Sequence, residues 1–141
     1  MNMKDERQFV GYSKYRSRLV DGHVHTELCP HGSGDRTAMM IEKAIELRIE
    51  KVCLTEHAPL PTAFAAEYGG DKKAYDTASL KLNQVDTYLE LGRQLQRAYG
   101  THIDISLGFE VDYIPGFESD IQEFLDRYGP LTDDNILSVH L

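Results

Sequence analysis

The stretch DGHVH at residues 21–25 closes the first apolar run of the sequence, which begins near Arg18. Alternate residues of a strand point the same way, so the pattern predicts that Asp21, His23 and His25 project into one site. Imidazole and carboxylate groups suit zinc, manganese or iron, whereas thiolates would indicate a structural zinc site. We therefore expect both histidines to bind metal, with Asp21 as a candidate to orient a ligating histidine through its other ring nitrogen.

Three further short apolar runs also end in polar residues; they are KVCLTEH (51–57), IDISLGFE (103–110) and ILSVH (136–140). Helical patterns separate the four runs, so the expected element order is β-α-β-α-β-α-β. This alternation predicts an α/β fold of parallel strands with right-handed helical crossovers. Four strands fit either a small open sheet or the first part of a barrel.

The helices are predicted from apolar stripes, the first of which consists of Ala38, Ile41, Ile45 and Ile49. Ser33 or Asp35 is expected to cap the first turn of that helix. A longer helix is expected over residues 78–99. Ser119 and Gln122 have the spacing of a capping box and predict the start of a short third helix.

Each strand ends in a residue that can bind a metal, and parallel strands bring their carboxyl ends to one face. The later strands contribute His57, Glu110 and His140 to the predicted cluster. His31 lies in the Pro/Gly loop that follows the DGHVH stretch. Its position fits a metal ligand and a residue that only makes hydrogen bonds within the loop equally well. Glu56 would point away from its neighbour His57 in a regular strand, so we expect it to support a ligand rather than to be one.

Other residues near the predicted site are expected to be structural. Cys29 is expected to fill a small apolar or loop position, and Cys53 to lie in the core, both as reduced thiols. His102 precedes the third strand and should lie on the surface at the opposite end. Residues 58–76 contain two prolines and a Gly-Gly pair, which predicts a long loop of the kind that is often functional.

The composition is that of a globular chain with an acidic balance. The sequence has 141 residues, 15 Lys+Arg and 23 Asp+Glu, and a formal net charge of −8. That balance argues against general nucleic-acid binding, which needs basic surface. No apolar run approaches a membrane span and no secretory signal is evident, so we expect no membrane partner and a cytoplasmic location.

Five segments of this sequence resemble successive motifs of the PHP (polymerase and histidinol phosphatase) family; they are DGHVHT (21–26), CPHG (29–32), TEHAP (55–59), GFEVD (108–112) and SVH (138–140). The EHAP run and DYIPG at residues 112–116 favour the histidinol-phosphatase branch. The resemblance extends from about Leu19 onward.

The resemblance implies a distorted (β/α)7 TIM-like barrel with two or three divalent metal ions, as zinc, manganese or iron, at its C-terminal face. By this resemblance His23 and His25 hold one metal, His31 and His57 a second, and His140 a third, and Glu110 bridges two of them. It also implies hydrolysis of L-histidinol phosphate to L-histidinol and phosphate, in histidine biosynthesis. The attacking group would be metal-activated water, without a covalent phospho-enzyme.

Family members continue beyond the fourth strand, so we expect residues 19–141 to be the first part of the barrel domain. The residues before Leu19 exceed the usual short start of this branch, so we expect residues 1–18 to be an extension. An open half-barrel exposes strand edges, which predicts self-association or low stability of the isolated chain. Two alternatives remain open from the sequence: a PHP-type phosphoesterase for another phosphomonoester, and a non-catalytic metal-binding fragment.

Overall fold

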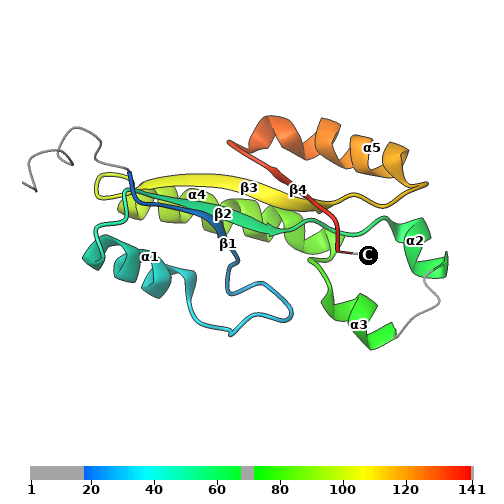
Figure 1. Cartoon of the computed structure of the whole chain (residues 1–141), viewed down its shortest axis with the longest axis horizontal. Coiled ribbons are helices and arrows are strands. Elements are labelled where there is room, and N and C mark those ends of the chain that lie inside the picture. Colours follow the sequence, from blue (N-terminus) through cyan, green and yellow to red (C-terminus); the bar gives the residue numbers. More distant parts are fainter. Residues whose placement is uncertain (1–17, 68–71, 141) are drawn as a thin grey trace, which may run out of the picture.

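The computed structural model describes residues 18–67 and 72–140, and the predicted extension at residues 1–18 lies almost entirely outside this range. Four parallel strands form one sheet in the order β1-β2-β3-β4 (Figure 1). The strands are β1 (Val20–Val24), β2 (Lys51–His57), β3 (Asp104–Asp112) and β4 (Ile136–Ser138). The predicted α/β alternation is confirmed, because neighbours in the sheet follow one another in the sequence.

Five helices and two 3₁₀ turns connect the strands in the described residues. They are α1 (Thr37–Glu46), α2 (Thr62–Glu67), α3 (Lys72–Thr77), η1 (Leu82–Gln84), α4 (Val85–Tyr99), α5 (Glu118–Tyr128) and η2 (Gly129–Leu131). The short helices α2 and α3 lie beyond the carboxyl end of β2 (Figure 1). None of the helices in the described ranges is long and apolar enough to cross a membrane.

The prediction of one long loop over residues 58–76 is wrong, because α2 and α3 occupy much of it. Pro61 directly precedes α2, where proline starts a helix rather than breaking one. The longer helix also begins later than predicted. The backbone N–H of Leu80 donates to the carbonyl of His57 at 3.3 Å, so this part of the chain is still tied to the end of β2.

The predicted helix caps are wrong as well. At α1 the backbone N–H of Thr37 donates to Glu27 Oε2 at 2.7 Å, so the carboxylate comes from an earlier loop rather than from Ser33 or Asp35. At α5 neither member of the predicted capping box acts as a cap, since the helix already begins at Glu118. At α1 the carboxylate of Glu27, from another segment, therefore takes the place of a local cap.

The core lies between the sheet and its helices. Alternate residues of β2 and β3 pack with the inner faces of α1, α4 and α5; fully buried members include Ile41, Leu54, Val85, Tyr88, Leu107 and Phe109. The other alternate residues of these strands include polar groups such as Thr55, His57 and Glu110. Because His57 and Glu110 are partners in the β2–β3 register, the sheet brings them side by side.

Tyr88 of α4 is fully buried and joins β2 to β3 through its hydroxyl group. The oxygen lies 2.6 Å from the carbonyl of Gly108 and 3.0 Å from that of Leu54, and it accepts a bond of 3.3 Å from the backbone N–H of Glu56. These groups are buried, so removing their partner leaves them unsatisfied. The hydroxyl therefore fixes the strand that carries Glu56.

We predict that Tyr88→Phe lowers the free energy of unfolding by about 1–3 kcal/mol, the usual cost of leaving buried polar groups unpaired. Urea denaturation monitored by circular dichroism measures it. Tyr99→Phe is the matched control, because Tyr99 lies on the same helix but donates to Glu42 in an exposed position. An equal loss of stability in both variants would contradict the prediction.

Candidate metal centre

Glu110 of β3 lies at the centre of a cluster of four histidines that come from the ends of β1, β2 and β4. Its Oε2 atom is 2.9 Å from His23 Nε2, 3.3 Å from His25 Nε2 and 3.3 Å from His57 Nδ1. Its Oε1 atom is 3.3 Å from His140 Nε2. Parallel topology thus converts four distant sequence positions into one site.

The atoms His23 Nε2, His25 Nε2 and Glu110 Oε2 form a tight triangle. The two nitrogens are 3.0 Å apart, and each is within 3.3 Å of the carboxylate oxygen. A proton on His23 can bond to only one of its two neighbours, whereas a divalent cation can bind all three atoms. The spacing and chemistry of these donors fit a metal ion.

His25 is held in place by a fully buried carboxylate. Glu56 Oε1 accepts from His25 Nδ1 at 3.1 Å, and Glu56 Oε2 accepts from the backbone N–H and the hydroxyl of Thr26 at 2.8 and 2.6 Å. Because Nδ1 donates its proton to Glu56, the lone pair of His25 is on Nε2 and faces Glu110. This carboxylate–histidine arrangement is the usual way in which proteins orient a metal ligand.

Two further histidines are oriented in the same way. His140 Nδ1 donates to Asp112, whose Oδ1 also accepts from the Ser138 hydroxyl at 3.0 Å. His31 Nδ1 donates to the backbone carbonyl of Thr77 at 2.8 Å. Each ring therefore keeps the Nε2 lone pair that a metal ligand needs.

The electrostatics of the cluster keep its carboxylate ionised. Burial alone raises the pKa of Glu110, but the hydrogen bond from His23 and the nearby imidazoles outweigh it, so the pKa lies below its ordinary value. The hydrogen bond to Glu56 raises the pKa of His25, and that to Asp112 raises the pKa of His140. Metal binding at these two rings therefore competes with protons.

His57 differs from the other rings because its Nδ1 atom is buried and makes no hydrogen bond, although Glu110 Oε2 lies 3.3 Å away. Burial also lowers the pKa of His57, which favours the neutral imidazole that binds metals. A buried polar atom without a partner is costly unless something else binds it. The unsatisfied Nδ1 atom of His57 is thus a second feature that fits a bound cation.

The structure brings most of the predicted site residues together, but Asp21 lies apart from the rings. Its carboxylate is 3.5 Å from the backbone nitrogen of His23, a neighbour in the same strand. β1 has a register irregularity between Asp21 and Val24, which breaks the simple alternation that the prediction assumed. His31 lies at the rim, with its ring centroid 4.9 Å from that of His57. His102 is exposed at the opposite end of β3, as expected.

Three residues next to the cluster were not identified from the sequence as supporting groups. Thr26 fixes Glu56, and Asp112 with Ser138 fixes His140. Asp112 and Ser138 are 26 positions apart and meet only because they are partners in the β3–β4 register. Thr26 directly follows the DGHVH stretch, so its position was the one local signal available.

The fold and this cluster define an α/β domain of barrel type with a candidate metal centre at the carboxyl ends of its strands. The PHP domain matches residues 21–141, and the chain belongs to the PHP family. The resemblance seen in the sequence motifs is thereby confirmed.

Curated and solved relatives are histidinol phosphatases. The chain is 41% identical over 120 residues to the histidinol-phosphatase of Bacillus subtilis, covering 85% of this chain and 43% of that protein. A Listeria monocytogenes structure assigned as a histidinol phosphatase shares 43% identity with a TM-score of 0.84, covering 86% of this chain and 44% of that one. The chain thus spans less than half the length of the relatives it matches.

A more distant structure carries ligands. It is the histidinol phosphate phosphatase of Lactococcus lactis complexed with zinc, L-histidinol and phosphate. The identity is 26% and the TM-score 0.66, with 88% of this chain and 41% of that one covered. These neighbours confirm the predicted fold class, an α/β half-barrel of four parallel strands.

Proposed function

We propose that this chain provides the amino-terminal strands and metal ligands of a phosphatase that hydrolyses L-histidinol phosphate. The observation that carries the proposal is the carboxylate of Glu110 on β3 in contact with four histidines from the ends of the other three strands. The relatives named above support the substrate. By the family pattern, His23 and His25 would hold one ion, His31 and His57 a second, and His140 a third, and the Glu110 carboxylate would be shared between ions.

Each residue has a separate task in this proposal. When bound, divalent ions supply Lewis acidity toward the phosphate oxygens and activate water for attack on phosphorus. Glu110 contributes an ionised carboxylate, as its lowered pKa favours. Glu56 and Asp112 keep the rings of His25 and His140 in the orientation and tautomer that binding requires.

A cavity beside the cluster has room for the leaving group. Its volume is about 330 Å³, within the usual range for small-molecule sites. Its lining combines polar residues such as His57 and His140 with apolar ones such as Leu60, Phe64 and Tyr75. We place the phosphate at the histidines and the histidinol part against the apolar wall.

We predict that chelation abolishes phosphate release from L-histidinol phosphate by the purified protein, and that added Zn²⁺ or Mn²⁺ restores it. His25→Ala should lower turnover and metal content, turnover by more than about 100-fold, because loss of a mere orienting group already costs 10–100-fold. The control is His102→Ala, which removes an exposed imidazole at the end of β3 opposite the cluster. It should leave turnover and metal content within about twofold of the wild type.

A substrate panel with a nucleoside monophosphate and p-nitrophenyl phosphate tests the specificity part of the proposal. Preference for either compound over L-histidinol phosphate would assign a different phosphomonoester. Full metal content and turnover in His25→Ala would refute the site itself.

A further inference from the structure

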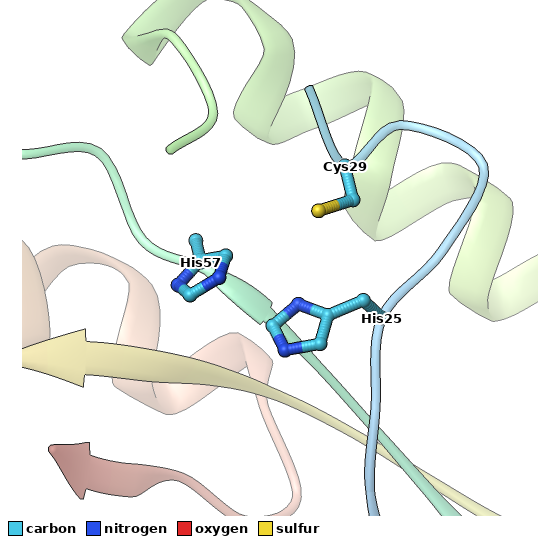
Figure 2. A group of neighbouring side chains, drawn as sticks. All are labelled: His25, Cys29 and His57. Carbon is cyan, nitrogen blue, oxygen red and sulfur yellow. The ribbon is translucent and has the colours of Figure 1, made fainter. Parts of the chain in front are cut away.

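A second group of possible metal ligands lies next to the first and includes a thiol. Cys29 Sγ and one ring nitrogen each of His25 and His57 all lie within 4.8 Å of one another. Figure 2 shows the three side chains pointing toward a common space, with Cys29 on the loop that follows β1. Ligand atoms of one zinc ion are about 3–4 Å apart, so small side-chain rotations suffice to bring them into range.

The loop holds the thiol in this place. The backbone N–H of Cys29 donates to the carbonyl of Thr26 at 3.0 Å, and its own carbonyl accepts from Gly32 N–H at 3.2 Å. A Cβ atom at Gly32 would lie 3.1 Å from Cys29 Cβ and 3.6 Å from Sγ. The cysteine side chain is therefore packed closely against Gly32.

The buried imidazole beside the thiol also has an atom that no hydrogen bond satisfies, although Glu110 Oε2 lies 3.3 Å from it. His57 is 7% exposed, and its Nδ1 atom has no hydrogen-bond partner. Cys53, the other cysteine, is similarly buried at 7% but belongs to no such group in the described residues. Burial alone therefore does not explain why Cys29 lies beside two imidazoles.

We propose that Cys29 is a further ligand of the metal centre and binds, as a thiolate, the ion held by His57. This inference rests on the proposed function, since it shares His25 and His57 with that site. On binding, the S–H bond breaks, the proton passes to solvent, and a sulfur–metal bond forms. A thiolate makes this position selective for thiophilic ions such as zinc over manganese.

Cobalt substitution tests the proposal without an activity assay. The metal-free protein is titrated with Co²⁺, and a sulfur-to-cobalt charge-transfer band in the near ultraviolet is expected. The band should be present in the wild type and in Cys53→Ser, and absent in Cys29→Ser while the visible cobalt bands remain. A band that persists in Cys29→Ser would overturn the proposal.

Two other outcomes separate this inference from the proposed function. Bound Co²⁺ with visible bands but no charge-transfer band in the wild type would overturn the Cys29 assignment and leave the metal centre intact. Failure of the wild type to bind Co²⁺ at all would contradict both the Cys29 assignment and the proposed metal centre.

Alkylation of the wild-type protein gives a second measurement that needs no variant. Zn²⁺ should slow the reaction of iodoacetamide with Cys29 by at least about 10-fold, as located by mass spectrometry, because a metal-bound thiolate is shielded from the reagent. Cys53 in β2 serves as the internal reference. Equal rates with and without Zn²⁺ would contradict the assignment.

Discussion

Glu110→Gln is expected to remove bound metal and to lower phosphatase activity by more than about 100-fold while the protein stays folded. Among the described residues, its carboxylate is the one group that contacts all four histidines of the cluster. The amide has nearly the same shape but lacks the charge, so the apolar packing of β3 is retained. Removal of groups that merely orient a metal ligand lowers metal affinity or activity about 10–100-fold, and loss of a central ligand should have a larger effect.

Elemental analysis, phosphate release and circular dichroism on the same sample check this expectation. Glu123→Gln is the matched control, because this residue lies exposed on α5. It makes the same chemical change outside the cluster and should leave metal content and activity within about twofold. Metal retention and near-normal turnover in Glu110→Gln would show that the histidines alone form the centre.

The cluster could be predicted from the sequence because it depends on topology rather than on fine geometry. Once the four apolar runs are parallel strands, residues at their carboxyl ends must share a face. The contact between His57 and Glu110 then follows from their register. No packing detail was needed for this step.

The supporting contacts could not be predicted in the same way. The hydroxyl of Tyr88 reaches backbone groups of two strands, and Cys29 reaches its imidazole neighbours through the shape of an irregular loop. Such contacts depend on how the elements pack and have no fixed sequence spacing. The prediction of the α1 cap failed for the same reason, since Glu27 accepts a hydrogen bond from the N–H group of a residue ten positions later.

Gly108 lies where the chain leading into β4 passes closest to β3. An added Cβ would lie 1.3 Å from the backbone oxygen of Asp134 and 2.6 Å from its carbonyl carbon. The neighbouring residues fix that segment, because Asp133 Oδ2 accepts from Leu107 N–H and Asn135 Oδ1 accepts from Phe109 N–H, both at 2.9 Å. The obstacle is thus a tethered backbone and not the end of a flexible side chain.

Gly108→Ala is therefore expected to lower the free energy of unfolding by more than about 3 kcal/mol, above the 1–3 kcal/mol typical of overpacked side chains. Because Glu110 follows two residues later on β3, metal binding should weaken together with stability. Gly129→Ala is the control; a Cβ there meets nothing within 4 Å, and its φ of −54° suits alanine. Thermal unfolding distinguishes the two variants, and a melting temperature of Gly108→Ala equal to that of Gly129→Ala would mean that the segment leading into β4 does not pass over Gly108 as described.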